Sequence, residues 1–240
     1  MKALAIDSST SALCFAACNG EKKALLSLDI GMRQSEKLLD GVECVLSHCD
    51  LKSENLDYTA LCSGPGTFTG LRLAFSALKA LSFAQNIPVY AFSTLDILAY
   101  PYRQWQGALI PALDAKKHSF YAAIYRNGIL NDGPFDASTE TILAHTDPEE
   151  NLLIVGADAA YFAEQARSIR PAQNIVTFLP VSGENGISDV KEVHAVFTLL
   201  DLAAKKFRAH EKPIEEYEGP FYMRKSEAEM SLVEQTGKNA

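Results

Sequence analysis

Short apolar runs that end in an aspartate open both halves of the chain. LAIDSSTSALCFAACNG predicts a strand ending at Asp7, a polar turn and a second strand that reaches an Asn-Gly pair at 19–20. The same order recurs in LIPALDAKKHSFYAAIYRNG, where the first strand ends at Asp114 and the Asn-Gly pair lies at 127–128. Asn-Gly favours a type I′ hairpin, because both central residues of that turn need positive φ. The pattern predicts an internal duplication.

Other segments of the chain have apolar residues at helical spacing. SEKLLDGVECVLSHC predicts a helix with Ser35 as its N-cap, and LRLAFSALKALSFAQN predicts a second helix that is apolar on almost every side. LDYTALCSG and IPVYAFS predict strands, and Ser-Thr at 93–94 opens a third helix. LLIVGA, AAYFAEQARSI and HAVFTLLDLAAKKFRAH predict a strand, a helix and a long amphipathic helix in the second half. The tail after His210 is charged, and its last residues, EQTGKNA, have nothing to bury.

KKALLSLDI at 22–30 predicts a third strand after the first Asn-Gly pair, and the second half repeats this start. Two three-stranded beginnings, each with an aspartate at a strand end, resemble the duplicated actin, sugar-kinase and Hsp70 superfamily. We therefore expect an α/β chain with this RNase H-like fold, in which two mixed-sheet halves enclose a cleft. The N-terminal half is expected at 1–106, with candidate partner-binding helices at about 35–49 and 70–85, and the C-terminal half at 107–240. Ligands of α/β sheets lie at the carboxyl ends of strands, so Asp7 and Asp114 are expected to face each other.

Composition narrows the classes of partner. The net charge is −8, and basic residues come only in short pairs. A chain that binds RNA by itself should show a basic face, so we expect another subunit to hold any nucleic acid. No apolar run approaches a membrane span and Asp7 interrupts the first one, so we expect no membrane contact and a cytoplasmic protein. Five cysteines without a C-x-x-C pair predict reduced thiols.

The stretch GPGTFTGLR at 64–72 looks like a phosphate-binding loop but lacks the features of one. A P-loop ends in Gly-Lys-Ser/Thr, whereas Gly70 is followed here by Leu71 and Arg72. The glycine spacing also differs from the G-x-G-x-x-G of dinucleotide sites. The loop therefore needs another explanation.

Five motifs, LAIDSST, GPGTFTGLR, FSTLD, ALDAKKHSFYAAIY and PFYMR, occur in this order between residue 2 and about residue 225. Together they resemble the bacterial TsaB (YeaZ) family. The resemblance implies a non-catalytic scaffold that binds and activates TsaD. That complex forms N6-threonylcarbamoyladenosine at position 37 of tRNAs that read codons beginning with A. It also implies the ATPase TsaE as a partner through the complex, a possible homodimer, and only indirect contact with tRNA. No cofactor is expected on this chain, because ATP or ADP and a metal belong to TsaD.

The resemblance assigns the helices at about 35–49 and 70–85 to the surface that pairs with TsaD or a second copy. In this interpretation Thr69 caps the second helix, and the glycine loop is part of an interface. Leu71, Phe75 and Leu78 mark one face of that helix, and Leu73, Leu81 and Ala84 the other, and either face can point outward. The candidate interface residues are Leu38, Val42, Val45, Thr69, Leu71, Arg72, Phe75 and Leu78.

Two enzymatic alternatives remain open. The first is an ATP-dependent kinase or ATPase, with Asp7, Ser8, Ser9, Thr10 and Asp114 as vestigial nucleotide-site candidates; the simpler alternative is that Asp7 caps its turn. The second is an M22-type metallopeptidase. A metal site is not expected, because no two histidines lie three to five residues apart and Gln34 stands where many family members have a histidine. The histidines are His48, His118, His145, His194 and His210.

Overall fold

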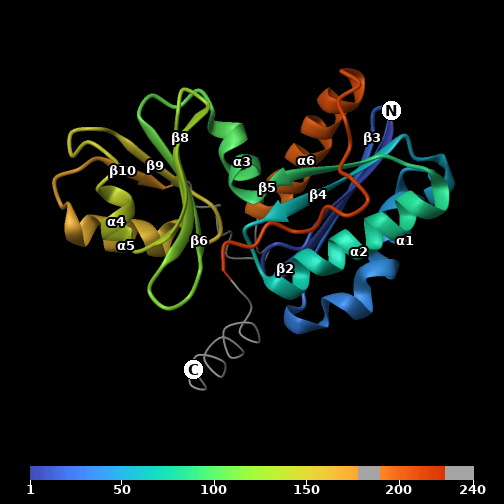
Figure 1. The fold of residues 1–240 in the computed structure, drawn as a ribbon, viewed down its shortest axis with the longest axis horizontal. Helices are drawn as coiled ribbons and strands as arrows, with labels where there is room; N and C mark the ends of the chain where they lie inside the picture. The colour runs from blue at the N-terminus through green and yellow to red at the C-terminus, as the bar shows by residue number, and fades with distance from the viewer. Residues whose placement is uncertain (178–189, 225–240) are drawn as a thin grey trace, which may run out of the picture.

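The computed structural model describes residues 1–177 and 190–224, whose strands form two mixed five-stranded sheets (Figure 1). The first sheet has the order β3-β2-β1-β4-β5, and the second has the matching order β8-β7-β6-β9-β10. In each sheet the first three strands in sequence pair antiparallel and the later two add in parallel. This repeated topology confirms the duplicated α/β fold. The strands of the first sheet are β1 (Lys2–Asp7), β2 (Ala12–Asn19), β3 (Lys22–Asp29), β4 (Tyr58–Gly64) and β5 (Val89–Ser93). Those of the second are β6 (Ala108–Asp114), β7 (Phe120–Arg126), β8 (Ile129–Ala137), β9 (Leu152–Val155) and β10 (Ile175–Thr177).

The two hairpins differ in turn type. In the second, both Asn127 and Gly128 have positive φ, as a type I′ turn requires. In the first, Asn19 ends β2 and the turn is made by residues 20 and 21, with positive φ at Gly20 alone. That prediction was therefore wrong for the first hairpin. The difference from the predicted turn has a cause outside the hairpin. Asn19 Nδ2 donates to the carbonyl oxygen of Cys49 at 2.9 Å, and this long-range hydrogen bond holds Asn19 in the strand.

Helices cover both faces of the first sheet. α1 (Gln34–His48) and α2 (Phe68–Gln85) bury their apolar sides on one face, and α6 (Val190–Arg208) packs on the other (Figure 1). α6 thus follows the second sheet in sequence but packs against the first. The strands divide at the expected boundary near residue 106, and the division of the whole chain into two halves stays a prediction.

The second sheet carries shorter helices. α4 (Thr139–Leu143) and α5 (Ala159–Ile169) lie on one face, and α3 (Thr94–Ala99) packs on the other against β6 and β7. Neither α4 nor β10 was predicted from the sequence. The remaining turns are the 3-10 helices η1 (Gly31–Arg33), η2 (Ser53–Asn55) and η3 (Tyr100–Tyr102). Across residues 1–177 and 190–224, no helix is both long and apolar enough to span a membrane. The EQTGKNA segment lies outside the described residues.

Two predicted helix caps are wrong, for a shared reason. α1 begins at Gln34 and α2 at Phe68, so Ser35 and Thr69 lie inside first turns. Gln34 Nε2 instead donates to the carbonyl oxygens of Thr10 and Ser11, at 3.2 and 2.9 Å. Thr67, just before α2, donates from its backbone N–H to the carbonyl oxygen of Ser9 at 2.7 Å. Both helix starts are therefore fixed by contact with the turn after β1 rather than by a local cap.

Candidate functional site

The glycine loop closes over the turn that follows β1. Thr67 donates from its backbone N–H to the carbonyl oxygen of Ser9 at 2.7 Å, and from Oγ1 to that of Ser8 at 3.2 Å. Ser8 Oγ in turn donates to the carbonyl oxygen of Gly70 at 2.6 Å. A Cβ atom at Gly66 would lie 2.4 Å from the Ser9 carbonyl oxygen, and one at Gly70 would lie 1.9 Å from that of Ser8. Both positions require glycine, because the loop and the turn after β1 approach each other too closely for a Cβ atom. Protein atoms therefore fill the space on that side of the loop.

Gly64 serves a different contact, with a segment near the end of the described chain. We call residues 211–224 the C-terminal strap. Its Phe221 donates from the backbone N–H to the carbonyl oxygen of Ser63 at 2.7 Å. Gly64 has a φ of 113°, and a Cβ there would lie 2.5 Å from the Phe221 carbonyl oxygen. The left-handed conformation and the close contact both require glycine.

The strap connects the two halves. On the first half, Tyr222 packs against Phe68 with ring centroids 4.4 Å apart, and Arg72 Nε donates to Tyr222 Oη at 2.9 Å. On the second half, Arg224 forms a bidentate ion pair with Asp136 and donates to the carbonyl oxygen of Ala115 at 2.7 Å. The side chains of Arg224 and Asp136 are largely buried, so this is a strong, charge-assisted contact. The sequence showed the motif PFYMR but not this role.

The two aspartates make the same local contact in both halves. Asp7 Oδ1 accepts the backbone N–H of Ser9 at 2.9 Å, and Asp114 Oδ1 accepts that of Lys116 at 2.7 Å. Each carboxylate therefore caps the turn two residues further on. Lys116 Nζ also donates to Asp114 Oδ2 at 2.7 Å. Partial burial raises the pKa of Asp114, but the hydrogen bonds from Lys116 outweigh it and hold that pKa below its usual value.

Two of the three hydroxyl groups that follow Asp7 have hydrogen-bond partners, one in the turn itself and one in α2. Thr10 Oγ1 accepts the backbone N–H of Ala12 at 3.3 Å, and Ser8 is bound to Gly70 as described. Ser9 Oγ is buried and, among the described residues, has no hydrogen-bond partner. Among the described residues, no hydrogen bond joins Asp7 to Asp114. The arrangement supports the capping interpretation of both aspartates.

A small cavity lies between the halves. Its volume is about 190 Å³, whereas ligand pockets usually have about 300–1,000 Å³. Phe221 of the strap lines it, as do Asp96 and Tyr125, which form a hydrogen bond at 2.6 Å. Burial and this bond raise the pKa of Tyr125 far above its usual value. Neither Asp7 nor Asp114 lines the cavity.

The candidate interface residues divide by burial. Leu38, Val45, Leu71, Phe75 and Leu78 lie in the core of this chain, so the fold leaves no surface for a partner to contact there. Their assignment as contact residues is corrected in this respect: the face of α2 that carries Leu71, Phe75 and Leu78 points inward because it covers the sheet.

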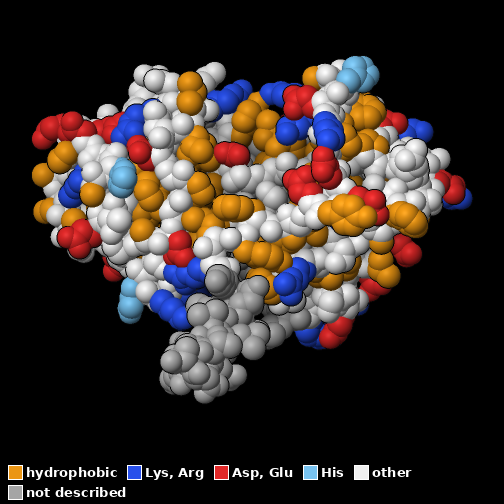
Figure 2. Space-filling model, in the orientation of Figure 1, with side chains coloured by type: hydrophobic (Ala, Val, Ile, Leu, Met, Phe, Trp, Pro, Cys, Tyr) orange, Lys and Arg blue, Asp and Glu red, His pale blue; other side chains and the backbone are white. Residues whose placement is uncertain are grey.

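The outer faces of both helices carry different apolar residues. Leu39 on α1 and Phe83 on α2 are 72% and 89% exposed, and neither was among the candidates. Of the candidates, Val42 is half-buried, while Thr69 and Arg72 are exposed. Figure 2 shows hydrophobic side chains at the surface over α2 and the strap. Helical periodicity located the helices, but it did not decide which side of an all-apolar helix the sheet would cover.

The described side chains offer no metal-binding cluster. Within them, no group of three His, Cys, Asp or Glu residues is placed to hold a metal ion. His145 contacts Asp132 at 3.5 Å and packs against Phe135. The side chain of His194 lies outside the described residues. All five cysteines are free thiols.

Known proteins resemble the chain over most of its length. Residues 31–231 match the family model described as "TsaD: tRNA N6-adenosine threonylcarbamoyltransferase". The tRNA threonylcarbamoyladenosine biosynthesis protein TsaB of Bacillus subtilis is 32% identical over 98 residues, which cover 40% of this chain and 43% of that protein. The chain spans about half the length of the curated relatives it matches.

Solved structures extend the similarity to the whole fold. A Pseudomonas aeruginosa protein described as similar to the peptidase YEAZ has a TM-score of 0.70 and 26% identity, covering 93% of this chain and 99% of that one. Component A of Acidaminococcus fermentans (R)-2-hydroxyglutaryl-CoA dehydratase has a TM-score of 0.51 and 11% identity, covering 87% and 99%, and shows the fold alone. The family-model match over residues 31–231, the relatives named TsaB and the similarity to the YEAZ-like structure show that the chain belongs to the TsaB/YeaZ family.

Proposed function

We propose that the chain is a scaffold subunit in the biosynthesis of threonylcarbamoyladenosine in tRNA, and that it acts by binding TsaD through the outer faces of α1 and α2. The relatives named TsaB support the pathway. The observation that carries the mode of action is the apolar outer surface of α2. Phe83 there is 89% exposed, and Leu73 and Leu81 are only half-buried.

The strap enlarges this surface. Lys79, one turn before Phe83, donates from Nζ to the carbonyl oxygens of Glu216 and Glu218. Tyr217 therefore lies on the same side of the molecule as α2, and it is 93% exposed. Large aromatic side chains that are exposed together are typical centres of protein interfaces, since a partner gains most by burying them.

TsaD is the partner we propose, because the resemblance to the TsaB family implies it and the family model described as TsaD matches this chain. A second copy of this chain is the alternative occupant of the same surface. In the complex, ATP or ADP and the metal belong to TsaD, and TsaE joins through the assembled subunits. The chain itself is expected to contribute no catalytic group.

The enzymatic alternatives have less support. A kinase or ATPase needs a free carboxylate and space for a nucleotide. Asp7, however, is buried and caps its turn, and the cavity that described residues line between the halves measures about 190 Å³. A metallopeptidase needs a metal, and the described side chains offer no cluster of ligands. We therefore expect the isolated chain to modify no adenosine and to cleave no peptide.

A pair of substitutions on α2 tests the proposal. Leu78 is 1% exposed, so Leu78→Glu should bury an unpaired carboxylate and unfold the chain. Phe83→Glu should leave circular dichroism and melting temperature unchanged but weaken pairing with the TsaD of the same organism by more than about tenfold. Ile129→Glu is the matched control, because Ile129 is also an exposed apolar residue but lies on the second sheet.

Light scattering with and without TsaD measures the pairing. A modification assay in which each subunit is left out in turn tests the function itself. Formation of the modified adenosine at an undiminished rate without this chain would contradict the scaffold role. Wild-type affinity of Phe83→Glu for TsaD would instead show that the interface lies elsewhere.

A further inference from the structure

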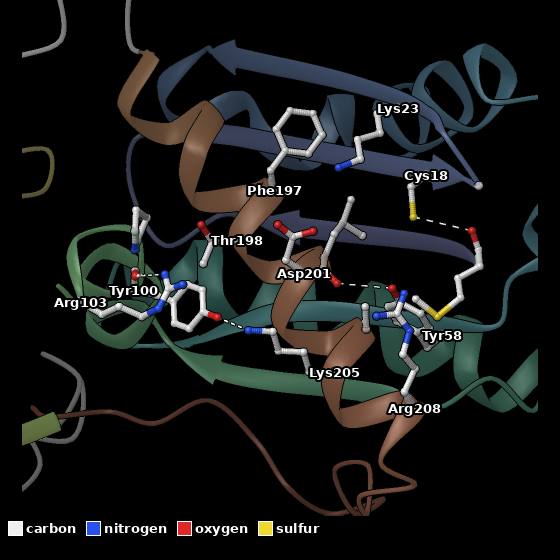
Figure 3. Close-up of a pocket in the computed structure, with 15 residues that line it drawn as sticks. Cys18, Lys23, Tyr58, Tyr100, Arg103, Phe197, Thr198, Asp201, Lys205 and Arg208 are labelled. Carbon is white, nitrogen blue, oxygen red and sulfur yellow. Dashed lines mark hydrogen bonds between the residues drawn. The ribbon is translucent and has the colours of Figure 1, made fainter. Parts of the chain in front are cut away.

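A wide groove runs along the outward face of α6, on the side of the first sheet away from α1 and α2. Its volume is about 770 Å³, and its walls come from β3, η3 and α6 (Figure 3). Four cationic side chains line it against one carboxylate, Asp201, in a chain whose net charge is −8. The four cations are Lys23, Arg103, Lys205 and Arg208. We propose that this α6 groove binds the sugar-phosphate backbone of an RNA strand.

The cations of the groove have no acidic partners. Among residues 1–177 and 190–224, none of the four forms an ion pair, although their neighbours in sequence do. Lys22 pairs with Asp50, and Lys206 contacts Glu211 at 3.8 Å. The fold neutralises the adjacent lysines and leaves those that line the groove available for an anion.

Aromatic rings hold these cations in place. Lys205 Nζ lies 4.7 Å from the ring centroid of Tyr100 and bonds its hydroxyl, and the Arg103 guanidinium lies 4.4 Å from the same ring. Lys23 Nζ lies 5.7 Å from the ring of Phe197. Cation–π contacts orient a charge without neutralising it. Half-buried rings beside guanidinium groups are also the surfaces on which bases of single-stranded RNA stack.

The spread of the cations favours a strand over a mononucleotide. Figure 3 shows Lys23 and Arg103 on either side of α6, with Lys205 and Arg208 on the helix itself. A terminal phosphate group is held by donors that converge on one point, whereas a phosphodiester backbone is met by cations spaced along a groove. The choice of RNA over an acidic peptide rests on the proposed function in tRNA modification.

The groove is suited to binding and not to chemistry. Tyr58 lines it but is buried and donates its hydroxyl to the carbonyl oxygen of Leu200 at 3.3 Å. Burial raises the pKa of the Cys18 thiol, which keeps it neutral and unreactive. The sequence suggested only indirect contact with tRNA, because its basic residues come in short pairs and residues 23 and 103 lie far from the pair at 205 and 208. Folding brings them to one groove.

Charge reversal on α6 tests this inference. An unmodified tRNA transcript is titrated into the full chain, alone and paired with TsaD, at several salt concentrations. Lys205→Glu with Arg208→Glu should lower the affinity at least about tenfold and reduce the slope of log affinity against log salt by about two. The matched control, Lys52→Glu with Lys117→Glu, makes the same change in net charge at exposed positions outside the groove and should stay within about twofold. Should the reversal disturb folding by circular dichroism, the glutamine pair at 205 and 208 replaces it, with a smaller loss in the same direction.

The outcomes separate this inference from the proposed function. Equal affinity of the groove variant and the control, while both still pair with TsaD, would overturn the groove and leave the scaffold role intact. Failure of the wild-type chain to pair with TsaD would refute the scaffold role, and RNA binding by the chain alone would then still be measured. Displacement of the transcript by ADP or by polyglutamate at matched phosphate or carboxylate concentration would refute the assignment to an RNA strand.

Discussion

The glycine loop makes a sharp prediction at Gly70. This residue lies in the first turn of α2, and a Cβ there would sit 1.9 Å from the carbonyl oxygen of Ser8 and 2.5 Å from Thr67 Oγ1. Real Cβ atoms do not approach a backbone oxygen so closely, so Gly70→Ala must move the turn after β1 or the start of α2. The hydrogen bond from Ser8 Oγ to the Gly70 carbonyl ties the same two segments together and opposes that movement.

The magnitude follows from two opposing terms. Overpacking costs typically about 1–3 kcal/mol of folding free energy. The upper value applies here, because the added Cβ would overlap the carbonyl oxygen of Ser8, which belongs to the backbone. Alanine in a helix returns up to about 1 kcal/mol of propensity relative to glycine. We expect a net loss of about 2 kcal/mol, and at about 2–4 °C per kcal/mol the melting temperature should fall by about 4–8 °C.

Thermal unfolding followed by circular dichroism measures this, with Gly219→Ala as the control. Nothing lies within 4 Å of a Cβ at Gly219, so that change should shift stability by less than about 0.5 kcal/mol. Gly66→Ala, which would place its Cβ 2.4 Å from the Ser9 carbonyl oxygen, should behave like Gly70→Ala. If Gly70→Ala melts at or above the temperature of Gly219→Ala, the loop does not depend on this close contact, and the phosphate-binding interpretation regains support.

Three further changes test neighbouring parts of the structure. Asp7→Asn should lower the melting temperature slightly and leave the assembled complex within about tenfold of normal activity; a larger loss in a folded, assembled variant would indicate a nucleotide site. Arg224→Ala should leave Asp136 unpaired and release the end of the strap, which faster backbone hydrogen exchange around Phe221 would report and unchanged exchange would contradict. Because the pKa of Asp114 is depressed in the folded chain, its contribution to stability is present above about pH 4 and is lost as pH falls through the lower folded pKa. Asp114→Asn should therefore be less stable than the wild type at neutral pH, and acid titration of both should show that difference shrinking.

The spacing of apolar residues predicted those strands and helices whose formation depends on residues nearby in the sequence. The duplication followed from two apolar strands that end in Asp7 and Asp114, and the structure repeats the same strand order in both sheets. α1, α2, α5 and α6 followed from helical spacing. The cap prediction at Ser35 failed because a long-range contact decided the helix start: Gln34 binds the turn after β1, which lies more than twenty residues away. Side-chain chemistry at one position does not encode such a contact.

The candidate site was less predictable for the same reason. The outward face of α2 depends on which side the sheet covers, and the sequence offered two apolar sides. The strap contributes Tyr217 to that surface only because Lys79 holds residues 216 and 218 beside α2. Likewise, the cations of the α6 groove become neighbours only because α6 crosses back to the first sheet. None of these features has a periodic signature.

The aspartate turn makes different contacts in the two halves. These contacts explain why we propose a function at the surface of the chain rather than at a nucleotide site between the halves. In the first half the glycine loop closes on Ser8 and Ser9, so backbone occupies one side of the turn. In the second half Lys116 neutralises Asp114. The strap then fastens Phe221 to the first half and Arg224 to the second. A nucleotide that opened and closed the halves would have to break these contacts in each cycle, including a largely buried bidentate ion pair. These connections suit a rigid subunit that presents a fixed surface, and we propose that the exposed aromatic side chains on α2 and the strap form that surface.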